Sequence, residues 1–208
     1  MNMNYFLSLL LGYGLGCLNP AALLSKIKKQ DLRKVGTHNL GASNTLLVMG
    51  KKWGALVMLF DIFKSFFSAK LAKWLFPQLY AVQLVAGLGA VLGHIFPFYL
   101  GFRGGKGLAA FGGMVLAYDP LLFCVLLAFG LVMMLLFNCS VAMPMSAAPL
   151  FAILAGIRSQ SFAVFVLAAV SAAIIVIKHW SNIEKARNGN DVKIRSFVRN
   201  GLSETSIK

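Results

Sequence analysis

Residues 120–138 read PLLFCVLLAFGLVMMLLFN, a run without a single charged side chain. A helix of about 20 apolar residues is long enough to cross the roughly 30 Å hydrocarbon core of a bilayer. The whole chain has the same character, since 59% of its 208 residues are hydrophobic, 12% are charged and the mean hydropathy is +0.77. A soluble domain has about a quarter of its residues charged. These values predict an all-α polytopic integral membrane protein.

Seven apolar segments can be drawn outward from this run, punctuated by Pro77, by Asp119-Pro120 and by residues 156–161. The fourth has only about twelve residues, so we expect it to be tilted or partly re-entrant. No internal repeat or low-complexity linker interrupts the pattern, and we expect residues 1–208 to form a single membrane-embedded domain. The expected segments are about 3–25, 53–76, 79–100, 107–118, 120–138, 140–157 and 161–179.

The basic residues are distributed unevenly between the two sides of this arrangement. If the N-terminus lies outside, the cytoplasmic parts of the chain are residues 26–52, the loop 101–106 and the tail. These parts hold sixteen of the 20 lysines and arginines, whereas the outside connections hold only Arg158. Positive residues collect in cytoplasmic loops, so we expect a cytoplasmic C-terminus. The same topology, with attraction to anionic lipid, explains the formal net charge of +14 without a nucleic-acid partner.

Three polar stretches then arrive at the same, cytoplasmic face. They are residues 35–44, 93–107 and 178–191, and each combines glycine with asparagine, histidine or basic side chains. Glycine exposes backbone N–H groups and basic side chains supply positive charge, which suits a phosphate-bearing ligand. The chain therefore looks like a membrane enzyme that acts on a phosphorylated substrate at the lipid surface.

The clearest candidate site is a glycine loop that leads into an apolar helix. A helix N-terminus carries partial positive charge and unpaired N–H groups, to which lysine and arginine add charge-assisted bonds. The nucleotide-binding motif GxxxxGK[ST] is absent. A plain glycine-rich turn with ordinary cytoplasmic charges is the alternative interpretation. The loop consists of Arg103, Gly104, Gly105, Lys106 and Gly107.

The first polar stretch presents short polar side chains around glycine. This composition suits ligand binding, and it equally suits a helix cap and turn, so both interpretations stay open. The residues concerned are Gly36, Thr37, His38, Asn39, Gly41, Ser43 and Asn44.

Asp61 and Lys64 lie inside the second apolar segment, three residues apart and so on one helical face. Charges at this depth usually face the interior of a helix bundle or an aqueous cavity. The two could form an ion pair that supports the site, Lys64 could reach a phosphate, or the pair could be purely structural. The three histidines, His38, His94 and His179, lack metal-ligand spacing. We therefore expect no metal and no cofactor, and no Ser-His-Asp arrangement can be drawn.

Taken together, these stretches resemble the acyl-phosphate-dependent glycerol-3-phosphate acyltransferases, the PlsY family of bacterial inner-membrane enzymes. Residues 31–36 leading into 39–44 look like the first loop of that family. Residues 93–97 leading into 104–107 look like the second and are the most specific match. His179, Asn182 and Gly189 look like the last, with Asp191 where a glutamate is usual.

The resemblance implies a reaction. An acyl phosphate would donate its fatty acyl group to the 1-hydroxyl of glycerol 3-phosphate, giving 1-acylglycerol 3-phosphate and phosphate for phospholipid biosynthesis. It would take place at the cytoplasmic face of the bacterial inner membrane, with no cofactor. The implied catalytic residues are His179, Asn182, Asn39 and Asn44; those that bind substrate phosphate are Gly41, Ser43, Lys64, His94, Arg103, Gly104, Gly105, Lys106 and Gly107; those that support them are Asp61, Gly36 and Thr37.

At two positions the chain lacks an arginine that the family usually has, and Leu47 and Asn138 stand there instead. Either arginine would be expected to hold substrate. The sequence therefore leaves open the same fold acting on a different acceptor, a non-catalytic relative, or a transporter. A transporter usually shows paired repeats around a midplane site, which this chain lacks.

Overall fold

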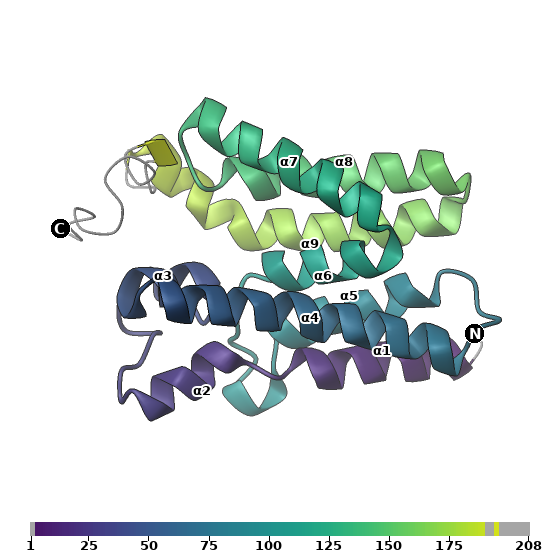
Figure 1. The fold of residues 1–208 in the computed structure, drawn as a ribbon, viewed down its shortest axis with the longest axis horizontal. Helices are drawn as coiled ribbons and strands as arrows, with labels where there is room; N and C mark the ends of the chain where they lie inside the picture. The colour runs from purple at the N-terminus through teal and green to yellow at the C-terminus, as the bar shows by residue number, and fades with distance from the viewer. Residues whose placement is uncertain (1–2, 190–193, 196–208) are drawn as a thin grey trace. The chain divides into compact units, whose positions relative to one another are not determined.

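The computed structural model describes residues 3–189 and 194–195, and all regular structure within them is helical (Figure 1). This confirms the predicted all-α class. Contacts within the chain group into two compact units, Met1–Pro120 and Leu121–Lys208. Each unit is described by itself below, and the single domain stays a prediction.

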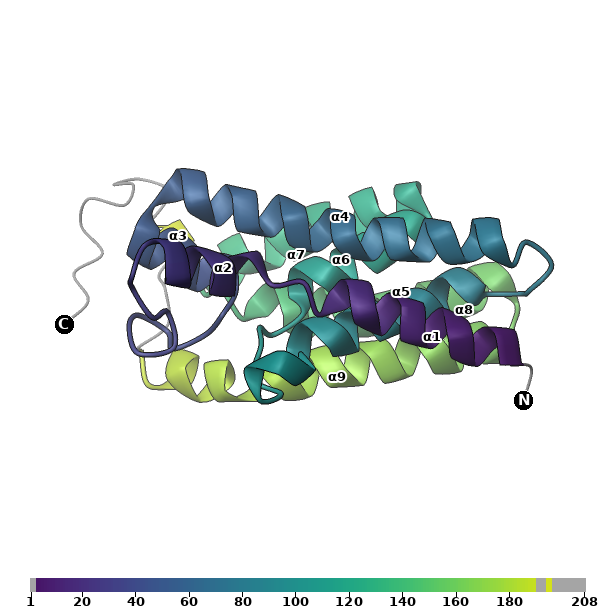
Figure 2. The ribbon, with the colours of Figure 1, turned by 90° about the horizontal axis from the view of Figure 1, so that it is seen from below.

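The first unit carries both of the polar loops that precede residue 108. In Figures 1 and 2 its helices α1, α4 and α5 run side by side, and α2 and α3 lie at one end, next to the loop that connects them. Its described elements are α1 (Met3–Gly16), α2 (Pro20–Ile27), α3 (Ala42–Met49), α4 (Lys51–Leu75), α5 (Val82–Ile95), the 3-10 helix η1 (Phe98–Leu100) and α6 (Leu108–Tyr118).

The second unit consists, in its described part, of three long helices. They are α7 (Pro120–Phe137), which begins at the last residue of the first unit, α8 (Ala142–Ser159) and α9 (Phe162–Arg187). Helices α8 and α9 pack along each other, and Gly156 lies against Phe165 where the chain turns between them. Ser161 caps α9, because its hydroxyl accepts a hydrogen bond from the N–H of Val164.

Five helical stretches in the described residues are long and apolar enough to cross a membrane: Met3–Ile27, Val82–Leu100, Pro120–Phe137, Ala142–Ser159 and Phe162–Arg187. Helix α6 is apolar but short, as expected for the fourth segment. Helix α4 has 25 residues, but every stretch of 18 within it includes at least three charged side chains. It is therefore long enough to cross a membrane but too charged to be counted among these five. The predicted apolar segments correspond to helices to within a few residues, except that the first segment is broken and the last extends to Arg187. Helix α3 was not predicted.

The first apolar segment breaks into two helices at Cys17–Asn19 for a local chemical reason. Asn19 caps α2, since its Oδ1 accepts a hydrogen bond of 2.9 Å from the N–H of Ala22, and Pro20 occupies the first helical position. Two tyrosine hydroxyls connect this part of the chain with the residues around η1. The hydroxyl of Tyr99 donates to the carbonyl of Cys17 at 2.8 Å, and that of Tyr13 donates to Phe96 at 2.8 Å.

Glycines allow α1 and α5 to approach each other closely. A Cβ atom added at Gly12 or Gly16 would collide with the carbonyl of Ala86 or Ala90 in α5, and one added at Gly93 would collide with the carbonyl of Tyr13 in α1. Small residues four apart are typical of tight helix contacts in membranes, where packing rather than the hydrophobic effect drives association. This contact fixes the position of the C-terminal end of α5, which carries His94.

Candidate active site

The first polar loop, residues 28–41, is organised around one buried side chain. Asn44 lies in the first turn of α3 and has no exposed surface. Its Nδ2 donates to the carbonyls of Leu32, Val35 and Asn39 at 2.8, 3.1 and 3.0 Å, and its Oδ1 accepts from the N–H of Thr37 at 2.7 Å. Asn44 therefore holds the loop backbone in place. The N-cap of α3 is Gly41, so no serine or asparagine side chain caps this helix.

Gly36 allows this arrangement. Its φ of +63° lies in the left-handed region, and a Cβ atom there would collide with the Oδ1 of Asn44. Asn39 and Thr37 are partly buried, whereas Ser43 and His38 are exposed. The ring of His38 is within hydrogen-bond distance of the Arg33 carbonyl, at 3.1 Å.

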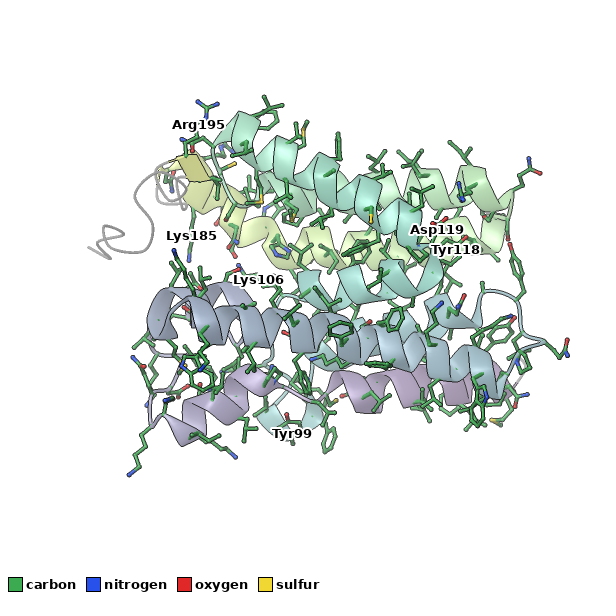
Figure 3. The ribbon with its side chains drawn as sticks, viewed as in Figure 1. Tyr99, Lys106, Tyr118, Asp119, Lys185 and Arg195 are labelled. Atoms are coloured by element: carbon green, nitrogen blue, oxygen red, sulfur yellow. The ribbon has the colours of Figure 1, made fainter. Side chains whose placement is uncertain are left out.

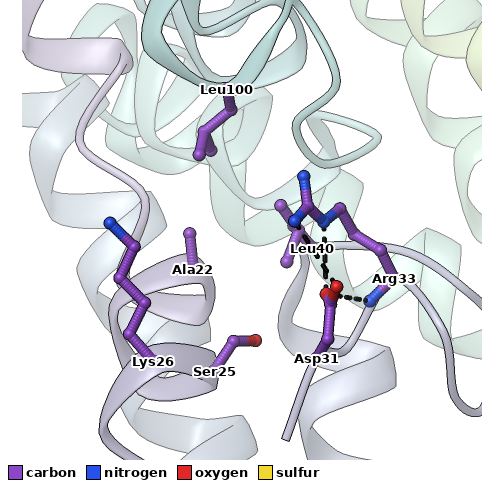
Figure 4. Close-up of a pocket in the computed structure, with 7 residues that line it drawn as sticks. All are labelled: Ala22, Ser25, Lys26, Asp31, Arg33, Leu40 and Leu100. Carbon is purple, nitrogen blue, oxygen red and sulfur yellow. Dashed lines mark hydrogen bonds and ion pairs between the residues drawn. The ribbon is translucent and has the colours of Figure 1, made fainter. Parts of the chain in front are cut away.

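An exposed ion pair marks the margin of the loop. The Nε of Arg33 lies 3.1 Å from the Oδ1 of Asp31, and hydrogen bonding from this guanidinium holds the pKa of the Asp31 carboxyl below its ordinary value. A hollow of about 200 Å³ beside the pair is lined by Ala22, Ser25, Lys26, Asp31, Arg33, Leu40 and Leu100 (Figure 4). A second hollow of about 280 Å³ is adjacent to it, and Ala22, Lys26 and Leu100 line both.

The glycine loop, residues 101–107, is tied to the end of α5. The N–H of Gly104 donates to the carbonyl of Ile95 at 3.0 Å, and the N–H of Gly105 donates to that of His94 at 3.1 Å. Two amides that we expected to face a phosphate are therefore bound to protein carbonyls. Gly107, with φ +88°, is the N-cap of α6. The N–H groups in the first turn of α6 have no acceptor within the helix, and they directly follow the glycine loop.

The first polar loop and the glycine loop lie against each other at Leu40. The Leu40 carbonyl accepts a hydrogen bond of 3.3 Å from the Nδ2 of Asn19, and it would lie 2.9 Å from a Cβ atom on Gly105. Two stretches separated by about sixty residues are thus neighbours in the first unit. Lys106, labelled in Figure 3, stands between Gly105 and the start of α6 and is partly buried, while Arg103 is exposed.

Asp61, Lys64 and His94 form a buried cluster beneath the glycine loop. The Nζ of Lys64 lies 2.7 Å from the Oδ1 of Asp61, and the Nδ1 of His94 lies 3.2 Å from the same oxygen. Neither contact has the angles of a directed hydrogen bond to that oxygen, and the contact between Lys64 and Asp61 is an ion pair. The ion pair foreseen from the spacing of Asp61 and Lys64 is present. The prediction that Lys64 and His94 bind phosphate stays a prediction.

The third polar stretch belongs to the second unit. His179 and Asn182 lie within α9 and not in a loop after it, and their spacing of three puts them on one helical face. His179 is buried, and its Nδ1 donates to the Ile175 carbonyl at 2.8 Å, which leaves Nε2 as the acceptor nitrogen of the neutral ring. Gly189 follows with φ +75°, and Asp191 lies outside the described residues.

The two positions that depart from the family pattern have different surroundings. Leu47 is a partly buried residue of α3. Asn138 follows α7 with φ +52°, and its Oδ1 accepts from the N–H of Arg195 at 2.8 Å. The guanidinium of Arg195 donates to the carbonyls of Leu135 and Leu136, which complements the negative end of α7.

The sequence prediction missed one participant, the break between α1 and α2. The Leu18 carbonyl at this break accepts a hydrogen bond of 2.6 Å from Lys64, and Asn19 binds Leu40 in the first polar loop. Asn19 followed by Pro20 is a helix-start signal that could have revealed the break. Its contact with Lys64, 46 residues away, has no local signal.

The fold and these loops define an integral membrane protein of a known class. The model of the family described as glycerol-3-phosphate acyltransferase matches residues 6–189. A glycerol-3-phosphate acyltransferase of Listeria monocytogenes is 36% identical over 199 residues, covering 94% of this chain and 99% of the relative. One of Thermoanaerobacter pseudethanolicus is 33% identical over 189 residues, covering 90% and 94%.

Solved structures agree with this. The crystal structure of PlsY (YgiH), an integral membrane glycerol 3-phosphate acyltransferase, in its glycerol 3-phosphate form has a TM-score of 0.86 and 29% identity, covering 94% of this chain and 98% of that one. Its lysophosphatidic acid form has a TM-score of 0.81 and 28% identity, covering 91% and 94%. The chain belongs to the glycerol-3-phosphate acyltransferase family.

Proposed function

We propose that the protein transfers a fatty acyl group from acyl phosphate to the 1-hydroxyl of glycerol 3-phosphate. The observation that carries this proposal is the family match over residues 6–189, which spans both polar loops of the first unit and the His179 stretch of the second. The products would be 1-acylglycerol 3-phosphate and inorganic phosphate, used in phospholipid biosynthesis.

The chemistry needs no nucleophilic side chain. An acyl phosphate is a mixed anhydride, so the acceptor hydroxyl attacks the carbonyl carbon, the bond to the phosphate oxygen breaks, and phosphate leaves with the electron pair. The hydroxyl proton passes to a phosphate oxygen. Positioning two anionic substrates and stabilising their charge supplies most of the acceleration in such a reaction.

The geometry refines the roles that we expected. Lys106 and the N–H groups at the start of α6 are the phosphate donors in this proposal, with Arg103 at the margin. Gly104 and Gly105 shape the loop, because their own N–H groups are bound to α5. Asn44 likewise positions the first polar loop through its four backbone hydrogen bonds. Gly36 and Thr37 support that loop, and Asn39, Gly41 and Ser43 face the substrate from it.

His179 and Asn182 position the acceptor in this proposal. The Nε2 of His179 is the acceptor nitrogen of a ring fixed by the Ile175 carbonyl, so it can receive a hydrogen bond from the 1-hydroxyl of glycerol 3-phosphate. Asn182, one turn further along α9, offers both a donor and an acceptor.

The topology belongs to the same proposal. Counting the broken pair α1–α2 as one crossing and adding α4 to α9 gives seven, with the N-terminus outside and the C-terminus in the cytoplasm. The distribution of basic residues supports this orientation. The site then opens at the cytoplasmic face of a bacterial inner membrane, where soluble glycerol 3-phosphate and a lipid-embedded acyl phosphate can meet.

The test is a product assay on the purified protein in detergent. Palmitoyl phosphate is supplied with and without glycerol 3-phosphate, and both phosphate release and the lipid product are measured. We expect release that depends on the acceptor, together with 1-palmitoylglycerol 3-phosphate. Release that is indifferent to glycerol 3-phosphate would instead indicate a different acceptor and give weight to Leu47 and Asn138.

A further inference from the structure

Three ionisable side chains from two helices are buried together in the first unit. Asp61 and Lys64 come from α4 and His94 from the last turn of α5, and their side chains are only 2%, 3% and 3% exposed. Buried charges are costly to desolvate, and apolar residues of similar volume often serve stability as well. The cluster therefore requires an explanation beyond stability.

The ammonium of Lys64 has two hydrogen-bond partners and one ion-pair partner, Asp61. The Leu18 carbonyl lies 2.6 Å from its Nζ, the Oδ1 of Asp61 lies at 2.7 Å and the Nδ1 of His94 at 3.0 Å. These three partners come from the α1–α2 break, α4 and α5. The ammonium group thus connects three parts of the chain, of which α5 binds the glycine loop.

This contact fixes the protonation of His94. An ammonium group can only donate, so a hydrogen bond between Nζ and Nδ1 requires that Nδ1 carry no proton. The proton of the neutral ring is then on Nε2. In this form Nδ1 cannot donate to the Oδ1 of Asp61, which lies 3.2 Å away and is paired with Lys64.

His94 holds the glycine loop in two ways. Its carbonyl accepts the hydrogen bond from the N–H of Gly105 at 3.1 Å, and the Nε2 edge of its ring lies where a Cβ atom on Gly105 would be. Gly105 is itself buried. A shift of the His94 ring toward Gly105 would therefore displace the loop that leads to Lys106.

We propose that Asp61 and Lys64 are positioning residues for the glycine loop, acting through the ring of His94. Asp61 orients the ammonium of Lys64, Lys64 fixes the His94 ring as its Nε2–H form, and the ring holds Gly105 and the residues after it in place for phosphate. This inference rests on the proposed function, since it assigns these residues a part in that reaction.

The kinetic test separates positioning from stability. Asp61→Asn and Lys64→Met each leave an unpaired charge, so each is expected to lower both the melting temperature in detergent and the activity. The double variant Asp61→Asn/Lys64→Met buries no unpaired charge. We expect its melting temperature to return toward that of the unsubstituted protein. We expect its kcat/KM for glycerol 3-phosphate to stay about tenfold or more below the value of the unsubstituted protein.

Lys70→Met is the matched control, because Lys70 lies on the same helix with its side chain exposed over the Phe66 ring. We expect unchanged activity and melting temperature. A double variant that regained both stability and full activity would overturn the positioning role and leave the proposed function intact. An unsubstituted protein without acceptor-dependent acyl transfer would instead contradict the proposed function.

A second measurement does not depend on the folding of any Asp61 or Lys64 variant. Nitrogen-15 NMR of the histidine rings distinguishes the two neutral forms from the cation, and His38→Gln and His179→Gln identify the other two signals. We expect His94 to be neutral and protonated on Nε2. A proton on Nδ1, in either the neutral ring or the cation, is incompatible with the bond from Lys64 and would also overturn the proposal.

Discussion

At the scale of single residues, chemical type alone did not decide which side chains face a ligand. Asn39 and Asn44 look equivalent in the sequence, yet Asn44 is fully buried and bound to four backbone groups. Lys64 looks like a phosphate ligand in the sequence, yet it is buried and its ammonium contacts Leu18, His94 and Asp61. The difference lies in what each side chain already binds.

Replacing Lys106 by alanine tests the phosphate site. We expect kcat/KM to fall about tenfold or more, because a charge-assisted hydrogen bond contributes roughly 1.5–3 kcal/mol. The melting temperature in detergent is expected to be unchanged. Lys70→Ala, on an exposed part of α4, is the control and is expected to keep full activity. An active Lys106→Ala variant would rule out this lysine as a phosphate ligand.

Replacing Asn44 by alanine tests the first polar loop. The change removes three donated hydrogen bonds and one accepted bond, and it leaves buried backbone groups unpaired. We expect a loss of stability on the order of 3 kcal/mol, which is roughly 6–12 °C in melting temperature for a chain of this size. Ser43→Ala, next to it but exposed, is expected to leave the melting temperature unchanged. Equal melting temperatures for both variants would contradict the role of Asn44.

At the scale of helices, close approach of backbones positions the site. Helix α5 carries His94 at its C-terminal end, and its register against α1 depends on glycines whose Cα atoms touch the opposite backbone. The α1–α2 break depends in turn on Asn19 and on contacts from Tyr99 and Lys64. A change far from the loops can therefore alter the site through α5.

Two glycines on α1 test this contact. A Cβ atom at Gly12 would collide with the Ala86 carbonyl, whereas one at Gly14 would meet nothing within 4 Å. We expect Gly12→Ala to destabilise the protein by about 1–3 kcal/mol, as overpacking does, and to reduce activity. Gly14→Ala is expected to change stability by less than about 1 kcal/mol. Melting temperatures in detergent provide the comparison, and a harmless Gly12→Ala would show that α1 and α5 can separate without cost.

At the scale of the whole molecule, the proposed topology puts the two ends of α4 on opposite sides of the membrane. The helix has 25 residues and so spans about 37 Å at 1.5 Å per residue. Its charged residues Asp61 and Lys64 are buried in the first unit, which removes the cost of exposing them to lipid.

Cysteine labelling in intact cells tests this arrangement. In a chain whose Cys17, Cys124 and Cys139 are replaced by serine, we expect Lys28→Cys to be protected from a membrane-impermeant thiol reagent, and Gln78→Cys to react. Both positions are exposed and lie beyond α2 and α4 respectively. Labelling of both, or of Lys28→Cys alone, would contradict the proposed orientation, and an unsubstituted cysteine-free chain shows the background.

The sequence by itself determined the membrane class, the approximate positions of the long apolar helices and the stretches that carry polar chemistry. These properties depend on hydrophobic length and on residue types that are adjacent in the chain, so they can be read locally. Only the tertiary structure decided which polar groups are already bound. Asn44 pairs with Leu32, Gly105 with His94 and Lys64 with Leu18. Such partners lie 11 to 46 residues apart, and no local pattern specifies them, because a hydrogen bond depends on which backbone groups the packing of the helices brings within reach.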